Sequence, residues 1–401
     1  MGLCTNAWEM PGDGLWLWGW RSMLKNNKKS ILILVNHDVV IYNFRLELVE
    51  RLLAEEYDVH ISSPYGERIC ELVNLGAVYH ETFISRHGMN PKDEMAVMLE
   101  YKKLVNMIKP IVVLGFTIKP NIYGALAAKS AGLPFIANIT GLGIAVEKRG
   151  WKQKAAVVLY IIAFTNVQRV FFQNKENMKF FRKHHIAIDK HALLPGSGVN
   201  LQRFAVAPQP ECGNGRKGKP VKFAFISRIM EEKGIEQYLA AAEKIRRIYP
   251  SAEFHVCGFC EDGYKGRLEE LHEKGVVKYH GMIRDVNSFM SRMHCIVHPT
   301  YYPEGLSNVL LEACACGRAV ISTDRAGCRE VIHNGVNGYL VPEKNVQELT
   351  KAIEKFIRLD NGRKAEMGKK GRELAEYKFS REIVVNAYMD EIYAIDKTEC
   401  I

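Results

Sequence analysis

Two carboxylates stand eight residues apart in the stretch "PEGLSNVLLE", residues 303–312. Glu304 lies where a loop leads into an expected helix, and Glu312 lies on the body of that helix among small and apolar residues. Burying a carboxylate without a partner is costly, so each needs hydrogen-bond donors. Eight residues of helix rise about 12 Å, roughly the reach from the sugar to the ribose of a nucleotide sugar. Hydroxyl groups of such a ligand could supply those donors.

The turn before this helix adds a second kind of binding group. Glu304 and Gly305 form the turn, and the next three residues, Leu306, Ser307 and Asn308, are expected to offer free backbone N–H groups at the helix start. Such donors suit a phosphate group.

Two cations occupy a comparable place earlier in the chain. "SRIMEEKGI" (227–235) directly follows an apolar strand, which puts Arg228 just past the strand and Lys233 near the start of the next helix. Cations at the carboxyl end of a strand are well placed to meet a phosphate. A lysine at a helix start is also often simply solvated, so this pattern gains weight only together with the two glutamates.

The elements that must position these residues alternate between apolar strands and helices. Continuous apolar strands of this kind predict an α/β fold with parallel sheets covered on both faces. The strands expected in the first half are 30–38, 59–62, 111–116, 134–140 and 169–173, and those in the second half are 221–227, 252–258, 276–281, 295–300 and 319–324.

A segment rich in proline and glycine, 207–220, separates the two halves. We therefore expect two Rossmann-like domains that face one another across a cleft, where ligands bind at the carboxyl ends of the strands. The expected divisions are an N-terminal extension (1–29, disordered), a first domain (30–204), a linker (205–220), a second domain (221–375) and a C-terminal helix that packs back on the first domain (376–401).

Composition narrows the class of protein. The net charge is +10, with 24 Lys/Arg against 17 Asp/Glu in residues 1–200 and 31 against 28 in the remainder. A basic first half fits an anionic membrane surface or a phosphorylated substrate, or else a solvated basic face.

Ten cysteines without framework spacing indicate buried free thiols in a reducing cytosol. No run of 18 uncharged apolar residues predicts a membrane span. Four of the five tryptophans lie in residues 8–20, which fits a disordered extension, a start codon placed too early, or a contact with a membrane interface.

The combined motifs resemble a known enzyme family. Glu-x7-Glu after a strand, together with "SR…EKG", is similar to the large family of retaining GT-B glycosyltransferases that use nucleotide-sugar donors (glycosyl transferases group 1). Supporting matches are "GVNLQRF" (198–204), "AGCREVI" (326–332) and "NGVNGYLV" (334–341). The resemblance extends from about residue 30 to 395. It is nearest to bacterial enzymes that extend lipid-linked oligosaccharides, because they share a motif similar to "IYNFR" (41–45).

This resemblance implies roles for the residues above. Arg228 and Lys233 would bind the donor diphosphate, with UDP the favoured nucleotide, and stabilise it as it leaves. Glu304 would hold hydroxyls of the donor sugar, and Glu312 would hold the ribose. The loop that contains Ile283 and Arg284 is similar to the segment that lies against the base.

The first domain contributes less certain positions. Many relatives carry a histidine near the end of the strand that reads "ANIT" here, whereas this chain has Thr140 followed by Gly141. What these two residues supply to the reacting centre is therefore left open. Arg45 of "IYNFR" is expected to meet the diphosphate of a polyprenyl-linked acceptor. The stretch 147–164 joins basic residues and Trp151 to an apolar helix, which is either an ordinary core helix or a contact with an anionic membrane on its cytoplasmic face.

The resemblance implies no cofactor and no metal. Asp-x-Asp, the metal-diphosphate clamp of the other glycosyltransferase fold, does not occur in the chain, and two cations can do the electrostatic work of a metal. A dinucleotide oxidoreductase would need Gly-x-Gly-x-x-Gly after the first strand, and "NHDVVIYN" has no glycine. An epimerase on the same fold and a non-catalytic sugar-binding protein remain the alternatives. No nucleic-acid partner is expected.

Overall fold

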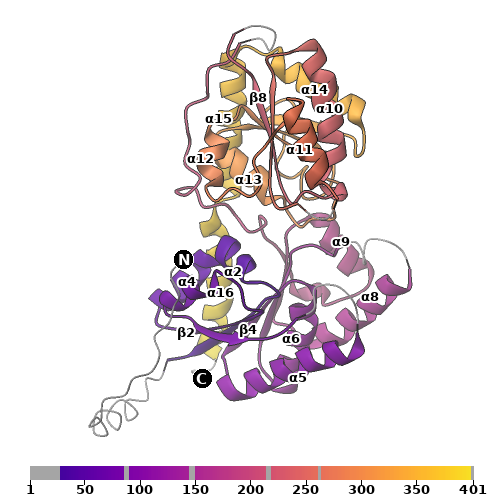
Figure 1. Cartoon of the computed structure of the whole chain (residues 1–401). Helices are drawn as coiled ribbons and strands as arrows, with labels where there is room; N and C mark the ends of the chain where they lie inside the picture. Colours follow the sequence, from indigo (N-terminus) through magenta and orange to yellow (C-terminus); the bar gives the residue numbers. More distant parts are fainter. Residues whose placement is uncertain (1–27, 85–89, 144–149, 214–217, 261–262, 399–401) are drawn as a thin grey trace, which may run out of the picture.

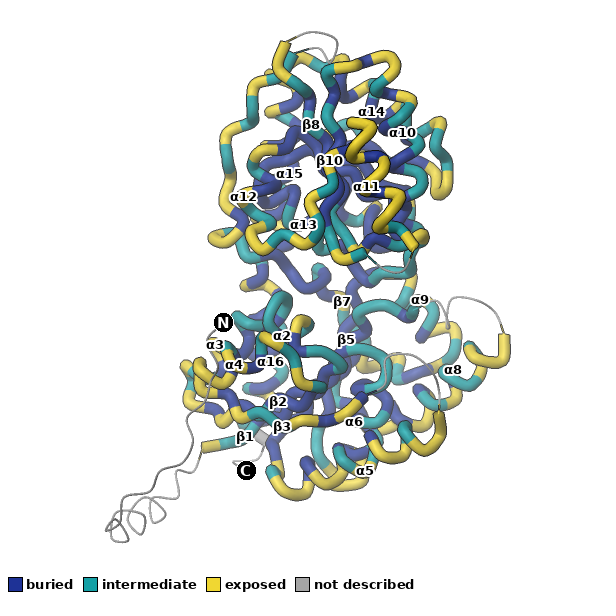
Figure 2. The backbone as a smooth tube through the Cα atoms, viewed as in Figure 1, coloured by how far each residue is buried: buried dark blue, intermediate teal, exposed yellow. Residues whose placement is uncertain are grey.

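The computed structural model describes residues 28–84, 90–143, 150–213, 218–260 and 263–398. These residues form two parallel β-sheets, each covered by helices on both faces, stacked one above the other in Figure 1. Residues 1–27 of the predicted N-terminal extension lie outside the residues that the structure describes. Figure 2 shows that the strands are buried in both halves, while exposed residues gather on the outer helices and loops. This arrangement confirms the predicted pair of Rossmann-like domains.

The first sheet has seven strands in the order β3-β2-β1-β4-β5-β6-β7. Its central strands are apolar without a break, so both faces are buried; β1, for example, is fully buried from Ile31 to Leu34. The strands are β1 (Ser30–Leu34), β2 (Asp58–Ser63), β3 (Val78–Glu81), β4 (Val112–Phe116), β5 (Phe135–Ile139), β6 (Arg169–Phe172) and β7 (His191–Leu193).

Helices cover the two faces of this sheet as separate apolar clusters. One cluster joins the sheet to α3 and α4, and the other joins it to α5, α6, α8 and α9. Asn90 and Asn174 cap α5 and α9 by accepting backbone N–H bonds. The helices are α2 (Asp38–Phe44), α3 (Leu46–Ala54), α4 (Ile69–Asn74), α5 (Pro91–Ile108), α6 (Ile118–Ser130), α8 (Trp151–Ala163) and α9 (Lys175–Lys183), with short 3-10 turns η1 (Phe164–Asn166) and η2 (Ile188–Lys190).

The second sheet has six strands in the order β10-β9-β8-β11-β12-β13, so its first strand also lies between the second and the fourth. The strand order reverses direction at this first strand. Open α/β sheets bind ligands beside the carboxyl ends of the strands at such a point. The strands are β8 (Lys222–Ile226), β9 (Glu253–Cys257), β10 (Lys278–Tyr279), β11 (Cys295–His298), β12 (Ala319–Thr323) and β13 (Gly338–Val341). The helices are η3 (Glu231–Lys233), α10 (Ile235–Ile248), α11 (Lys265–Glu273), α12 (Val286–Ser291), α13 (Asn308–Ala315), α14 (Val346–Ile357) and α15 (Asn361–Lys378).

The chain crosses between the two sheets twice, and the crossing segments pair with each other. Val199 donates its N–H to the Phe379 carbonyl at 2.8 Å, and Arg381 donates its N–H to the Val199 carbonyl at 2.9 Å. The last helix, α16 (Arg381–Thr398), then packs in the apolar cluster of the first sheet through residues such as Tyr388 and Ile392. Figure 1 shows it running back beside the N-terminal half.

The segment that follows the first crossing is fixed to the second domain. Arg318 is fully buried, and its guanidinium donates to the carbonyls of Ala207 (2.8 Å) and Pro208 (3.0 Å) and to the side chain of Gln209 (2.7 Å). A buried guanidinium needs such acceptors, and these carbonyls supply them. Among the described helices, none is both long and apolar enough to cross a membrane.

Candidate active site in the interdomain cleft

The loop between β11 and α13 places Glu304 against a cation from the segment that follows β8 in the same domain. The Glu304 carboxylate forms an ion pair with the ammonium of Lys233, and both side chains are largely buried. His298 Nε2 and Thr300 Oγ1 each lie 3.4 Å from the same carboxylate oxygen. The structure thus brings together two of the three predicted catalytic residues.

This setting keeps Glu304 ionised. Burial alone would raise the pKa of its carboxyl group, but Lys233 and His298 outweigh burial and hold that pKa well below its usual range. Burial lowers the pKa of His298, while Glu304 opposes that change. A permanently charged carboxylate can accept hydrogen bonds from hydroxyl groups, but it cannot donate a proton at neutral pH.

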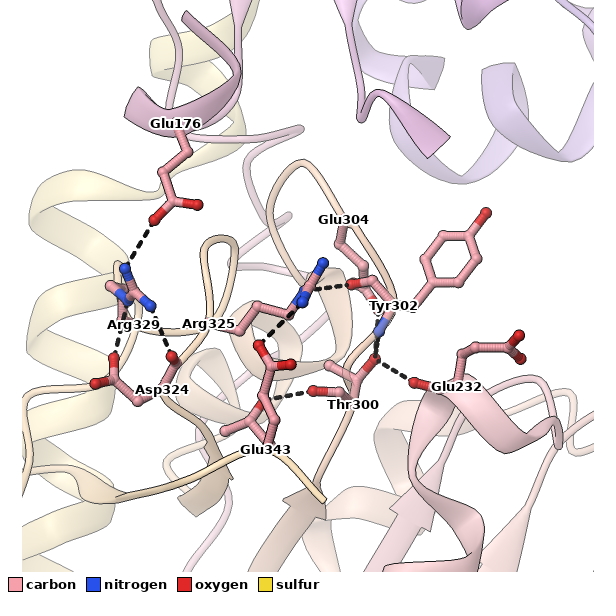
Figure 3. A network of polar contacts seen from close by, with 10 residues as sticks. Glu176, Glu232, Thr300, Tyr302, Glu304, Asp324, Arg325, Arg329 and Glu343 are labelled. Carbon is pink, nitrogen blue, oxygen red and sulfur yellow. Dashed lines mark hydrogen bonds and ion pairs between the residues drawn. The ribbon is translucent and has the colours of Figure 1, made fainter. Parts of the chain in front are cut away.

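The ring of Tyr302 lies close to both predicted cations. Lys233 Nζ lies 4.8 Å from the centre of the Tyr302 ring, and Arg228 Cζ lies 5.6 Å from it. Arg325 fixes the loop by donating to the Tyr302 carbonyl at 3.1 Å while it pairs with Glu343, as Figure 3 shows. Lys233 is 9% exposed, whereas Arg228 is exposed at the rim.

Two cavities meet at Glu304. The large cavity, of about 940 Å³, lies between the domains and is lined from both of them. The small cavity, of about 410 Å³, reaches along α13 to Glu312. Lys233, Glu304 and Asn308 line both, so the ion pair stands where the two spaces join. Arg228 is not among the described residues that line either cavity.

The helix start differs from the sequence prediction. Leu306 donates its N–H to Gln173 Oε1 at 3.3 Å, and Ser307 donates its N–H to the Gly327 carbonyl at 2.9 Å. These two groups are therefore not free, because the loop is folded against the first domain and against the turn after β12. Among the described contacts, no protein acceptor engages the N–H of Asn308 or Val309. The open donors thus begin two residues later than predicted.

Ser307 and Asn308 also carry side-chain atoms without partners. Ser307 Oγ and Asn308 Oδ1 are buried and have no hydrogen-bond partner in the described structure. Ser307 lines the small cavity, and Asn308 lines both cavities. Orphaned polar atoms in a cavity wall are expected where a polar ligand completes the site.

The two domains pack closely against each other at Gly305. A methyl group at this position would lie 2.3 Å from Gln173 Oε1 and 2.4 Å from the Thr140 carbonyl oxygen. Asn174 donates to the carbonyls of Glu304 (3.1 Å) and Gly305 (2.6 Å) while it caps α9. The first domain therefore holds the Glu304 loop by hydrogen bonds to the backbone carbonyls of that loop.

Glu312 lies at the far end of the small cavity. Burial raises the pKa of its carboxyl group to about 7, although Arg203 and Arg381 act in the opposite direction. Arg381 itself pairs with Glu47 at 2.7 Å. Glu312 is half-buried, and no ion pair within the described part of the chain engages it.

The remaining predicted residues fall into two groups. Arg45, Thr140 and Gly141 of the first domain line the large cavity. Ile283 packs against the core of the second domain and Arg284 is exposed, and neither is among the residues that line the two cavities.

Four residues at this site were not predicted from the sequence: Tyr302, His298, Gln173 and Asn174. Gln173 and Asn174 directly follow β6, and His298 ends β11, so each stands at the carboxyl end of a strand, which faces the cleft in this fold. A search for polar residues at strand ends could have found those three. Tyr302 differs because its position depends on the path of the loop.

A second interdomain contact lies at the edge of the cleft. Arg329 of the second domain pairs with Glu176 of α9 and with Asp324, each at 2.8 Å (Figure 3). These side chains are about half exposed, so the contact contributes on the order of 0–1 kcal/mol.

Comparison with known proteins agrees with this geometry. The family model for glycosyl transferases group 1 matches residues 213–374, and the model for glycosyl transferase 4-like domains matches residues 30–174. An N,N'-diacetylbacillosaminyl-diphospho-undecaprenol alpha-1,3-N-acetylgalactosaminyltransferase of Campylobacter jejuni is 26% identical over 79% of this chain and 86% of its own length. The capsular polysaccharide biosynthesis glycosyltransferase CapM of Staphylococcus aureus is 24% identical over 90% and 95%.

Solved structures share the fold at lower identity. HepE of Anabaena in complex with UDP and glucose superposes with a TM-score of 0.73 and 17% identity, covering 91% of this chain and 99% of HepE. A glycosyltransferase of Rickettsia africae gives a TM-score of 0.75 and 17% identity, covering 92% and 99%.

Proposed function

The chain is a glycosyltransferase with the GT-B fold, and we propose that it moves a hexose or N-acetylhexosamine from a UDP-sugar to a glycan acceptor with retention of anomeric configuration. The observation that carries this proposal is the buried Lys233–Glu304 pair at the junction of the two cavities. An ionised carboxylate beside a cation suits a sugar bonded to a diphosphate, because hydroxyls donate to the carboxylate and phosphate oxygens accept from the cation.

The donor lies along the small cavity in this proposal. The ribose donates hydrogen bonds to Glu312, whose carboxylate has no ion-pair partner among the described residues. The diphosphate meets the open N–H groups of Asn308 and Val309 at the start of α13, with Lys233 and Arg228 on its other side. The donor sugar then reaches Glu304. The presence of UDP in the HepE structure supports this choice of nucleotide.

The chemistry needs charge stabilisation more than a protein nucleophile. The bond between the anomeric carbon and the β-phosphate oxygen breaks, and negative charge develops on the departing UDP. Lys233 and Arg228 stabilise that charge, so the proposal includes no metal. The acceptor hydroxyl attacks from the face that UDP leaves, and its proton passes to the departing phosphate oxygen. Attack on that face retains the configuration.

The acceptor in this proposal is a sugar linked to polyprenyl diphosphate. Arg45 lines the large cavity, is 2% exposed, and has an Nε without a hydrogen-bond partner in the described structure. Residues of α6 and α8 also line this cavity, and they include the aliphatic side chains of Ile118, Ile122 and Leu159 as well as Lys119 and Lys152. A cavity lined by a buried cation and by aliphatic side chains fits a diphosphate with an isoprenoid tail. The name of the Campylobacter jejuni relative, which includes diphospho-undecaprenol, supports this class.

The outer face of α8 supports a peripheral contact with an anionic membrane at its cytoplasmic side. Trp151 is 69% exposed, and Val158, Ile161 and Ile162 are about half exposed on the same helix. Lys152 and Lys154 flank them, while Lys148 and Arg149 lie outside the described residues. Each basic residue near such a surface contributes only about 1 kcal/mol, so binding is salt-reversible. Replacing the four basic residues with Ser or Gln should release the protein from anionic liposomes without changing UDP affinity. Wild-type protein that ignores such liposomes would contradict this contact.

Titration with UDP and a panel of UDP-sugars tests the donor assignment. We expect micromolar to millimolar affinity for UDP and slow hydrolysis or no change of the sugar in the absence of acceptor. Release of an isomerised free sugar from the donor alone would favour the epimerase. Binding without transfer to any lipid-linked acceptor would favour a non-catalytic sugar-binding protein.

A further inference from the structure

Three buried polar side chains connect the Glu304 loop to the interior of the first domain. Leu306 donates its N–H to Gln173 Oε1 at 3.3 Å, and Gln173 Nε2 donates to Asn138 Oδ1 at 3.4 Å. Asn138 Nδ2 then donates to the hydroxyl oxygen of Tyr388 at 2.5 Å. All three side chains are at least 95% buried.

The far end of this series meets Arg45. The Arg45 guanidinium carbon lies 5.9 Å from the centre of the Tyr388 ring and 4.9 Å from that of Phe116. Arg45 donates from Nη1 to the Phe44 carbonyl at 2.6 Å, and its buried Nε has no hydrogen-bond partner in the described structure. Burial lowers the pKa of Arg45, and Tyr388 opposes that change. The rings of Phe116 and Tyr388 therefore both border the guanidinium.

Asn138 and Tyr388 line neither cavity among the described residues, whereas Gln173 and Arg45 line the large one. A ligand can therefore touch the two ends of the series but not its middle. Burying an asparagine and a tyrosine hydroxyl inside an otherwise apolar cluster is favourable only when their hydrogen bonds are satisfied. Here those bonds run from the second domain, through β5 and β6, to α16.

We propose that Asn138 and Tyr388 are positioning residues that couple the Glu304–Leu306 loop to Arg45, so that one buried connection aligns the two ligand sites. The identity of those sites, donor sugar at the loop and acceptor diphosphate at Arg45, rests on the proposed function. Closure of the Glu304 loop onto Gln173 orients Asn138 and Tyr388, and these orient Arg45. Loss of the Tyr388 hydroxyl breaks the series at its middle while it leaves the aromatic ring in place.

A calorimetric titration tests the coupling: inorganic pyrophosphate is added to protein that is saturated with UDP, and its affinity is measured. UDP fills the donor site, so the pyrophosphate reports on Arg45. Tyr388→Phe should weaken pyrophosphate binding roughly tenfold, a common size for coupling between sites, and change UDP affinity less than twofold. Arg45→Met should remove most of the pyrophosphate binding. The control is Tyr101→Phe, because the Tyr101 hydroxyl is buried in the same domain and has no hydrogen-bond partner in the described structure.

The double variant separates positioning from simple destabilisation. If Tyr388 acts through Arg45, Tyr388→Phe should cause no further loss in an Arg45→Met background. Additive losses, equal losses of UDP and pyrophosphate affinity, or unchanged pyrophosphate affinity in Tyr388→Phe would each overturn the coupling. Normal pyrophosphate binding by Arg45→Met would overturn it as well, as would wild-type protein that binds UDP but no pyrophosphate. Failure of the wild type to bind UDP would instead overturn the proposed function.

Discussion

The carboxylate of Glu304 and the ammonium of Lys233 meet in a buried ion pair although they lie 71 residues apart in the sequence. The two residues follow different strands of the second sheet, β11 and β8, which are neighbours in that sheet. Both residues line both cavities, so the carboxylate and the cation stand together at the junction of the two spaces. In the proposed reaction, the carboxylate accepts hydrogen bonds from the donor sugar while the neighbouring cation stabilises the diphosphate leaving group.

Removal of the Lys233 charge should impair both turnover and stability. We expect Lys233→Ala to lower kcat by about 10²–10³, the size of losing one transition-state charge donor. It also leaves Glu304 buried without its cation, which costs on the order of 3–5 kcal/mol of folding free energy. The pKa of Glu304 should rise in this variant, so residual activity should increase with pH. Steady-state kinetics and thermal unfolding check both effects.

Two arginines serve as comparisons for Lys233. Arg228→Ala should lower kcat by a similar factor with little change in Tm, because Arg228 is exposed. Arg228→Lys should also be impaired, since a point charge does not replace a bidentate contact. Arg267→Ala, which removes an exposed pair with Glu236 away from the cleft, should change neither quantity. Near-normal rates for both Lys233→Ala and Arg228→Ala would remove the two cations from the mechanism.

The two glutamates should separate turnover from nucleotide binding. Glu304→Gln should lower kcat more than UDP affinity, because its proposed contact is the reacting sugar. Glu312→Gln should chiefly weaken UDP binding, because its proposed contact is the remote ribose. Calorimetry with UDP and kinetics with the intact donor measure the two effects. Equal losses of UDP affinity in both variants would contradict the assignment.

Glu312 should make UDP binding depend on pH. Its pKa in the folded protein is raised to about 7, so the folded state holds an extra proton between about pH 4.5 and 7 and loses stability as pH rises through that window. Ribose hydroxyls favour the ionised carboxylate, so UDP affinity should rise from pH 6 to 8 with release of a proton.

Glu312→Gln is the matched control for this pH dependence, because UDP itself titrates near the same pH. Calorimetry in buffers of different ionisation enthalpy measures the proton release. The variant should retain only the contribution of the nucleotide. An identical pH profile in wild type and Glu312→Gln would rule out the ribose contact.

Gly305 should tolerate no side chain. A methyl group there meets Gln173 Oε1 and the Thr140 carbonyl within 2.4 Å, and the carbonyl cannot move as a side chain can. Gly305→Ala should therefore push the Glu304 loop away from the first domain and lower kcat at least tenfold. Gly266→Ala is the control, since a methyl group at Gly266 in α11 has no neighbour within 4 Å. Kinetics equal to the wild type in Gly305→Ala would show that this interdomain contact is not needed for catalysis.

The sequence predicted ten of the thirteen strands in the described structure, because strands depend on local pattern. It did not predict the ion pair, because it gave Glu304 the hydroxyl groups of a ligand as its partner, whereas Lys233 pairs with it in the structure. Apolar runs identify parallel strands, and residues just past neighbouring strands must gather at one edge. The occupied N–H groups of Leu306 and Ser307 could not be predicted, since their acceptors, Gln173 and the Gly327 carbonyl, come from distant segments. Nor could the sequence show that Ile283 and Arg284 lie outside the cavity walls, because loop paths are set by tertiary packing.

Activity should not depend on a divalent metal. Lys233 and Arg228 supply two positive charges, and the chain contains no Asp-x-Asp clamp. Assays in excess EDTA should therefore retain most of the wild-type rate, and added Mg²⁺ should change it little. Complete loss with EDTA, restored by Mg²⁺ or Mn²⁺, would overturn this part of the proposal.

The product of a complete reaction tests the central claim most directly. The protein is incubated with a panel of UDP-sugars and a polyprenyl-diphosphate-linked N-acetylhexosamine, and the product is isolated for proton NMR of its anomeric position. We predict a lipid-linked disaccharide whose new linkage has the anomeric configuration of the donor. A linkage of inverted configuration would contradict same-face attack beside Glu304, and an isomerised sugar without any linkage would contradict transfer itself.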